Sequence, residues 1–254
     1  MRFKLEMECS QREKDSNIIL ALDIAANSRS SLLSKSLKLL EKVHLYICAV
    51  KLNHHLILPL GLFDRVQQIL KLAHTYELPT IMDCKINDIG STNKVIAENY
   101  YKAGFDAVIA NPFVGWKEGL QPVFEIAERL EKGVILLCYM SHKAAWEGYG
   151  QTIQETKTDA STPQYVAFAK KALEWNADGV VVGATYPEKI EEIAKITTDK
   201  VPIYSPGVGA QGGDVRSAAE AGARYLIVGR AIFNAPNPAS MARQIREEAK
   251  LRKS

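Results

Sequence analysis

Cysteine is scarce in this sequence, and the few cysteines form no cross-linking or binding pattern. The 254 residues contain four, which lie far apart: Cys9, Cys48, Cys84 and Cys138. They include no C-x-x-C pair, and no histidines stand at a matching spacing, so neither a disulfide framework nor a zinc site is indicated. We therefore expect reduced thiols and a cytoplasmic protein.

Long apolar runs and a strong excess of one charge are also missing. No apolar run reaches the ~18 residues that a membrane-spanning helix needs. The formal net charge is only +3 and is evenly spread, so neither nucleic acid nor a membrane is an expected partner. Residues 1–16 are polar and lack the apolar core of a signal sequence. We expect them to form a flexible leader before a single domain over residues 17–254.

The sequence contains instead a repeated alternation of strand-like and helix-like segments. Short apolar runs, typical of buried strands, end at Asp23, Lys51, Lys85, Ala110, Met140, Gly183, Ser205 and Gly229. Helical periodicity is found in Ser31–Glu41, Phe63–Ala73, Asn93–Ala103, Glu118–Glu131, Gln164–Trp175, Pro187–Ile196, Asp214–Ala221 and Pro238–Lys250. Eight such repeats in one chain predict an α/β fold, a single-domain (β/α)8 TIM barrel.

Charged residues stand at the ends of several predicted strands. In a (β/α)8 barrel the active site forms at the carboxyl ends of the strands, which makes Asp23 and Lys51 candidates. In the third strand, alternation of side chains sends Asp83 and Lys85 to one face and Cys84 to the other, towards the helices. A lysine and an aspartate are therefore expected to share the mouth of the barrel.

The segment GVGAQGG, residues 207–213, matches the G-x-G-x-x-G pattern of dinucleotide-binding loops. A dinucleotide site also needs an acidic residue about 20 positions on, whereas the next strand here ends at Gly229 and Arg230. Loops after strands seven and eight of such barrels commonly bind phosphate. We interpret the loop, with Arg230, as a site for one phosphate group; a tight turn without a ligand is the alternative.

Four stretches together resemble the orotidine 5′-phosphate decarboxylase family. They are ALD at 21–23, DCKINDIGST at 83–92 with that family's D-x-K-x-x-D pattern, SPGVGAQGG at 205–213 and VGR at 228–230. The resemblance implies a homodimer with shared active sites that converts orotidine 5′-phosphate to UMP and CO2 in pyrimidine biosynthesis. It also implies that the reaction needs no metal ion and no organic cofactor.

The same resemblance implies roles for individual residues. The catalytic set is Lys51, Asp83, Lys85 and Asp88, in which Lys85 donates a proton to the carbanion at C6 and the two aspartates favour its charged form. The implied substrate-binding residues are Asp23, Ile89, Thr92, Ser141, Pro206, Gly207, Val208, Gly209, Gln211, Gly229 and Arg230. The loop that carries Asp88 and Thr92 is expected to cross a two-fold interface into the neighbouring site.

Other interpretations of the same residues stay open. A magnesium-dependent phosphosugar decarboxylase or aldolase shares the D-x-K-x-x-D pattern, but we expect a glutamate there in place of Lys51. The chain could also be a non-catalytic barrel that binds a phosphate ligand, with Asp83, Lys85 and Asp88 as a structural ion-pair network. His54 and His55 follow the second strand without a third metal ligand in view, and we expect a solvated loop there.

Overall fold

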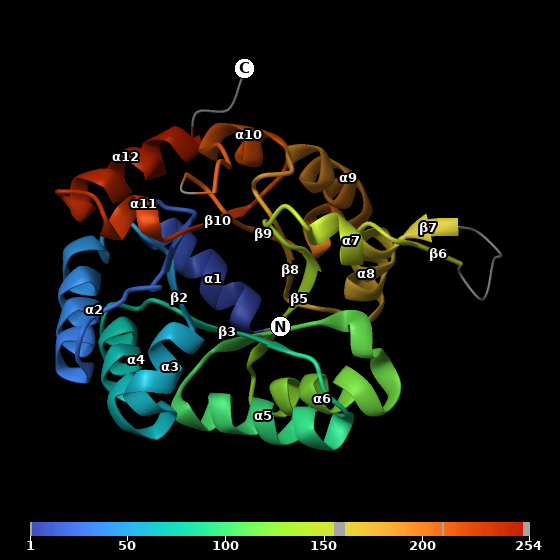
Figure 1. Ribbon diagram of the computed structural model, residues 1–254, viewed down its shortest axis with the longest axis horizontal. Coiled ribbons are helices and arrows are strands. Elements are labelled where there is room, and N and C mark those ends of the chain that lie inside the picture. The colour runs from blue at the N-terminus through green and yellow to red at the C-terminus, as the bar shows by residue number, and fades with distance from the viewer. Residues whose placement is uncertain (1, 155–160, 210, 251–254) are drawn as a thin grey trace.

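Eight parallel strands close into a barrel that is surrounded by helices (Figure 1). This computed structural model describes residues 2–154, 161–209 and 211–250. The strand order around the barrel is β1-β10-β9-β8-β5-β4-β3-β2. The predicted (β/α)8 fold is confirmed.

Each predicted strand is found, with ends that differ by a few residues. The barrel strands are β1 (Ile18–Ala21), β2 (Ala49–Asn53), β3 (Thr80–Ile86), β4 (Ala107–Ala110), β5 (Gly133–Tyr139), β8 (Gly179–Val182), β9 (Ile203–Pro206) and β10 (Tyr225–Val228). The amino-terminal helix is α1 (Arg2–Glu13), and the main helices that follow the barrel strands are α2 (Arg29–Val43), α4 (Val66–Thr75), α5 (Gly90–Ala103), α6 (Gln121–Arg129), α8 (Gln164–Glu174), α9 (Pro187–Thr197), α10 (Val215–Glu220) and α12 (Pro238–Lys250).

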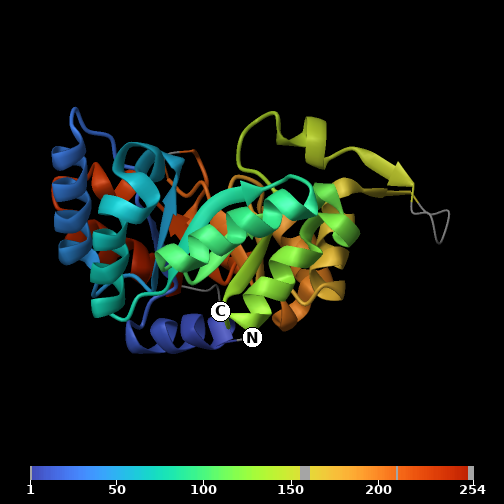
Figure 2. The same ribbon diagram turned by 90° about the horizontal axis from the view of Figure 1, so that it is seen from below.

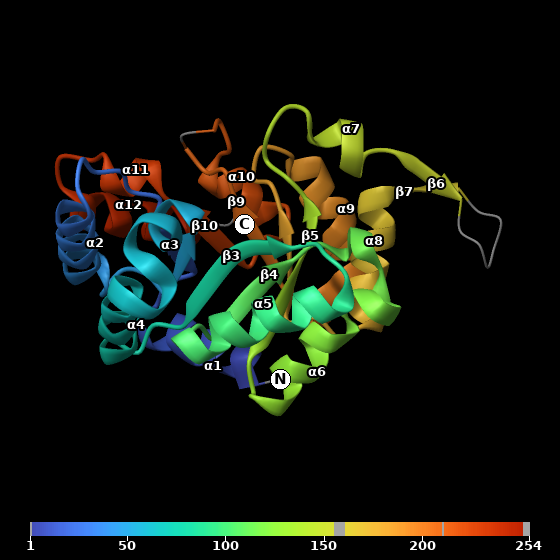
Figure 3. The ribbon, with the colours of Figure 1, turned by 60° about the horizontal axis from the view of Figure 1, so that its bottom comes forward.

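Shorter elements lie mainly in the loops between strands and helices. They are α3 (His54–Leu60), η1 (Gly61–Arg65), η2 (Pro112–Val114), η3 (Trp116–Leu120), α7 (Ala145–Tyr149), β6 (Thr152–Gln154), β7 (Ser161–Pro163), η4 (Thr198–Lys200) and α11 (Arg230–Phe233). The two-stranded hairpin β6–β7 projects sideways from the barrel (Figure 3). In the part of the chain that the structure describes, no helix has the length and apolar composition needed to cross a membrane.

The core has two layers, because side chains of a strand alternate between the inside and the outside of the barrel. In β1, Ile19 and Ala21 belong to the cluster inside the barrel, together with Tyr204. Ile18 and Leu20 belong to the larger cluster between the barrel and its helices. The filled interior makes the barrel a rigid support for side chains at its carboxyl end.

The amino-terminal segment is a packed helix and not the flexible leader that we expected. Helix α1 lies across the amino-terminal end of the barrel (Figure 2), where Phe3 and Met7 are 0% exposed. Ser10 donates a hydrogen bond of 2.7 Å to the carbonyl of Cys48. A Cβ atom on Gly133 would lie 2.4 Å from the Phe3 ring, so this glycine makes room for the helix. The expectation was wrong because a few apolar side chains, such as Phe3 and Met7, are enough to pack this polar segment against the end of the barrel.

Candidate active site

A cavity of about 460 Å³ opens at the carboxyl end of the barrel. Its inner wall is apolar and includes Ile109, Leu137 and Val181 from three different strands. Charged and polar side chains surround this apolar wall, as in pockets that bury a small organic ligand and fix its orientation. The architecture therefore places the candidate site where the sequence predicted it.

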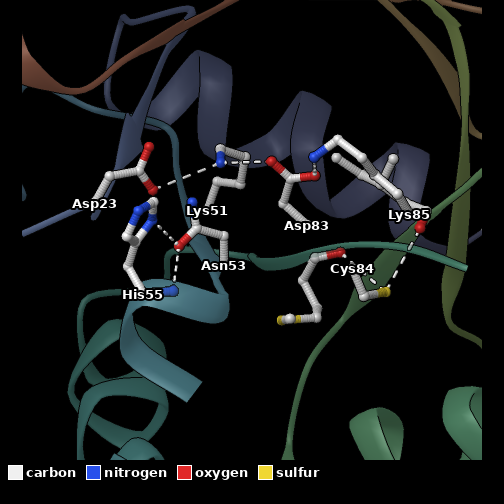
Figure 4. A network of polar contacts seen from close by, with 9 residues as sticks. Asp23, Lys51, Asn53, His55, Asp83, Cys84 and Lys85 are labelled. Carbon is white, nitrogen blue, oxygen red and sulfur yellow. Dashed lines mark hydrogen bonds and ion pairs between the residues drawn. The ribbon is translucent and has the colours of Figure 1, made fainter. Parts of the chain in front are cut away.

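Three charged side chains form a line along one side of the cavity (Figure 4). The Lys51 Nζ atom lies 2.8 Å from Asp83 Oδ2, and the Lys85 Nζ atom lies 2.5 Å from Asp83 Oδ1. Asp23 extends the line, because its Oδ1 atom is 3.8 Å from Lys51 Nζ. Asp83 is thus held between two ammonium groups, one of which, Lys51, is only 4% exposed.

The pairing fixes the charges of Asp83 and Lys51. Burial on its own would raise the pKa of Asp83, but Lys51 and Lys85 together outweigh it and hold the pKa at about 2. Burial likewise acts to lower the pKa of Lys51, and the carboxylates of Asp83 and Asp23 raise it above its usual value. At neutral pH the cavity therefore presents an aspartate carboxylate beside a lysine ammonium.

Lys85 lies in an irregular part of β3. Three residues of this strand, 83–85, stand opposite a single residue of β4, and Lys85 has a φ of +50°. For a residue with a side chain this left-handed backbone costs ~1–2 kcal/mol, and such strain tends to occur at functional sites. The Cys84 thiol points away from the cavity and contacts the carbonyl of Ile109 at 3.5 Å. Asp83 and Lys85 thus face the cavity together, as the alternation predicted.

The glycine-rich loop follows β9 and passes over the cavity. Gly207 has a φ of +99°, and a Cβ atom there would lie 2.7 Å from Gln211 Oε1 and 2.9 Å from Ser141 Cβ. The absent side chain therefore allows Gln211 to approach Ser141. Two N–H groups donate hydrogen bonds within the loop. That of Gly209 donates to the carbonyl of Gly213 at 2.7 Å, and that of Gly213 donates to the carbonyl of Gly207 at 3.1 Å. Because these two amides are bonded within the loop, a ligand would be bound by other groups. Ala210 lies outside the described residues.

Most of the predicted site residues line the cavity. Those that line it are Asp23, Lys51, Asp83, Lys85, Ser141, Pro206, Gly207, Val208, Gln211, Gly229 and Arg230. Asp88, Ile89, Thr92 and Gly209 are not among the lining residues. Asp88 and Ile89 are exposed on the loop between β3 and α5, where they are accessible from outside the chain.

Two polar residues that line the cavity, Asn53 and His55, were not predicted as part of the site. Strand β2 continues two residues beyond Lys51, so Asn53 lies on the same face as Lys51. The Asn53 side chain caps α3 by accepting a 2.8 Å hydrogen bond from the N–H of His55. The loop expected at His54 and His55 is therefore wrong, although both residues are exposed as expected. An asparagine before a helical run was the signal for a helix start. Within the described ranges, no three His, Cys, Asp or Glu side chains are grouped so that they could hold a metal ion.

The chain is similar to known proteins over nearly its whole length. The profile of the orotidine 5′-phosphate decarboxylase / HUMPS family matches residues 16–245. An orotidine 5′-phosphate decarboxylase of Methanosarcina mazei is 38% identical over 93% of this chain and 96% of its own. That of Pyrococcus abyssi is also 38% identical, over 91% of this chain and 98% of its own.

A solved structure agrees with these sequence matches. Orotidine 5′-monophosphate decarboxylase from Methanocaldococcus jannaschii, complexed with the inhibitor BMP, superposes with a TM-score of 0.78. It is 29% identical, and the match covers 93% of this chain and 99% of that one. Sequence and fold together show that this chain is an enzyme of the orotidine 5′-phosphate decarboxylase / HUMPS family.

Proposed function

We propose that this enzyme converts orotidine 5′-phosphate to UMP and CO2, with Lys85 as the proton donor and without a metal ion or organic cofactor. The observation that carries the proposal is the position of Asp83 between the ammonium groups of Lys51 and Lys85, at 2.8 and 2.5 Å. This arrangement places fixed charges of both signs at the mouth of a pocket with an apolar wall.

The proposed reaction needs a positive charge beside one ring carbon. When the bond between C6 and the carboxylate breaks, its electron pair stays on C6 in the plane of the ring, where no π system spreads the charge. The Lys85 ammonium stabilises this carbanion and then transfers a proton to C6, after which the neutral amine regains a proton from solvent. Asp83 faces the substrate carboxylate, and the repulsion between them is a second, smaller contribution to the rate.

The other cavity residues bind the rest of the substrate in this proposal. Arg230 holds the phosphate, Gln211 bridges the phosphate and the base, and Ser141 contacts the pyrimidine. Asp23, which lies near Lys51, binds a ribose hydroxyl. The remaining contacts come from Pro206, Gly207, Val208 and Gly229 of this chain and from Ile89 and Thr92 of a neighbouring one, and Gly209 acts by shaping the loop.

Lys51 favours this reaction over that of the magnesium-dependent phosphosugar enzymes. Its ammonium lies 2.8 Å from Asp83 and takes the place beside this carboxylate that a bound cation would need. A lysine there supplies positive charge but offers no ligand oxygen to a metal ion. The proposed reaction therefore proceeds on lysine and aspartate charges alone.

The test is an ultraviolet assay of orotidine 5′-phosphate loss, run with and without EDTA. We expect turnover in both conditions at equal rates, because every charge needed at C6 comes from the chain. Loss of activity in EDTA that magnesium restores would contradict the metal-independent reaction. Absence of turnover in both conditions would contradict the choice of substrate.

We expect Arg230→Ala to raise KM for orotidine 5′-phosphate by about 10- to 100-fold, which is the usual loss for a hydrogen bond to a charged group. Added guanidinium should partly restore the rate at low substrate concentration, because it supplies the missing phosphate donor. Arg216→Ala is the matched control, since Arg216 is exposed on α10 and does not line the cavity. An unchanged KM in the Arg230 variant would place the phosphate elsewhere.

We further propose that the enzyme is a homodimer with shared active sites, located in the cytoplasm. Ile89 and Phe113, on the loops after β3 and β4, are both 66% exposed, and apolar surface of this kind favours contact with another chain. Asp88 lies beside Ile89 and is not among the residues that line the cavity of its own chain. The cytoplasmic location is supported by the four cysteines, which are all unpaired.

A further inference from the structure

A single buried amide holds the backbone of Asp88 on both sides. Asn93, in the first turn of α5, is 0% exposed. Its Oδ1 atom accepts a hydrogen bond of 2.9 Å from the N–H of Asp88, and its Nδ2 atom donates one of 2.5 Å to the carbonyl of Asp88. The side chain therefore binds Asp88 as a neighbouring strand would, with one donor and one acceptor.

The same amide connects Asp88 to the loop after β4. The Nδ2 atom of Asn93 also donates a hydrogen bond of 3.0 Å to the carbonyl of Gly119 in η3. Both N–H groups and the oxygen of Asn93 are thus in use, which is three of the four hydrogen bonds that an amide side chain can make. Because the bonded groups are backbone atoms on two separate loops, the position of Asp88 depends on both.

Close backbone contacts surround this connection. A Cβ atom on Gly90, the residue at the start of α5, would lie 2.9 Å from the carbonyl oxygen of Glu118. A Cβ atom on Gly119 would lie 2.6 Å from the carbonyl oxygen of Val114. The contact at Gly90 brings the start of α5 against the loop after β4, and the contact at Gly119 lies within that loop and makes it compact where Asn93 bonds to it.

The Asp88 side chain itself has little other support. Its Oδ1 atom accepts a hydrogen bond of 2.7 Å from the N–H of Ile89, and the residue is exposed on the protein surface. No side chain caps the start of α5 in the structure as described, because the N-cap residue is Ile89. The bonds to Asn93 therefore fix the backbone from which the Asp88 carboxylate extends.

We propose that Asn93 is a positioning residue that aims Asp88 at the site in which it acts. The inference rests on the proposed function, in which Asp88 belongs to the catalytic set. Asn93 does not line the cavity, so its effect on the reaction passes through Asp88. A misplacement of about 1 Å can cost ~100-fold in rate.

The experiment is a double-mutant cycle on kcat that combines Asn93→Ala with Asp88→Ala. In the wild-type background Asn93→Ala should lower kcat by ~100-fold; in the Asp88→Ala background it should lower the residual kcat by less than about twofold, because the group that it positions is gone. Asn99→Ala is the matched control, since Asn99 lies on the same helix and its side chain donates a hydrogen bond of 2.9 Å to the carbonyl of Val95, within that helix. It should leave kcat unchanged.

Two further measurements separate the possible failures. Asn93→Asp keeps the size of the side chain but loses its donors, and it should reproduce the kcat loss. If neither Asn93 variant folds, the role is structural and the proposal is wrong.

Hydrogen exchange of the Asp88 amide should be slow in the wild type and fast in Asn93→Ala, whatever the substrate. An inactive wild-type enzyme would therefore overturn the proposed function and leave this readout intact. An equal kcat loss in both backgrounds would overturn the positioning role.

Discussion

Replacing Lys85 by alanine is expected to abolish turnover while a UMP-like inhibitor still binds. The ammonium acts mainly on charge that develops as CO2 leaves, so its loss raises the barrier far more than it weakens ground-state binding. We expect kcat to fall by at least ~10³-fold, the upper range for one electrostatic donor, and inhibitor affinity to fall by less than about tenfold. Steady-state assays and inhibitor titration of the same preparation measure both quantities.

Lys195→Ala serves as the control for removing a lysine. Lys195 pairs with Glu191 at 2.7 Å on the exposed face of α9 and does not line the cavity, so its variant should be fully active. In Lys85→Ala the Asp83 carboxylate keeps its contact with Lys51, so the site loses one charge without losing its other ion pair. If inhibitor affinity falls as far as kcat, Lys85 contributes to binding in general and the proposed role is wrong.

The barrel was predictable because its signals are local. Each strand is a short apolar run and each helix a periodic segment, and these patterns depend on neighbouring residues alone. The error at residues 1–16 lies where a longer-range contact decides, whereas the helix start after Asn53 had a local signal. The amino-terminal helix is stabilised by the open end of the barrel, against which Phe3 and Met7 pack, and no feature of residues 1–16 indicates that such a surface exists.

The line of charges at Lys51, Asp83 and Lys85 was also predictable, since strand ends and side-chain alternation place them. The irregular pairing of β3 was not, because its three residues facing one in β4 depend on the register between two strands. The contact between Asn93 and Gly119 spans 26 positions, and only the folded loops bring them together. The sequence thus predicts which charged side chains form the site, and tertiary packing determines their exact positions.

Mixing two inactive variants should restore activity if active sites are shared between chains. Lys85→Ala and Asp88→Ala homodimers are each expected to be inactive. After joint unfolding and refolding, about half of the dimers should be mixed, and each mixed dimer would have one site with both defects and one with neither. About a quarter of the wild-type activity should then return, which the ultraviolet assay measures at equal total protein.

The pattern of recovery distinguishes a shared site from a site within one chain. If Asp88 serves its own chain, every site keeps one defect and mixing restores nothing, while the chemistry at Lys85 is unaffected. Mixing Lys85→Ala with Asp83→Ala is the control, because these residues are bonded to each other at 2.5 Å in one chain and every mixed site remains defective. Asn93→Ala chains should complement Lys85→Ala as Asp88→Ala chains do, because the amide that positions Asp88 belongs to the chain that supplies it.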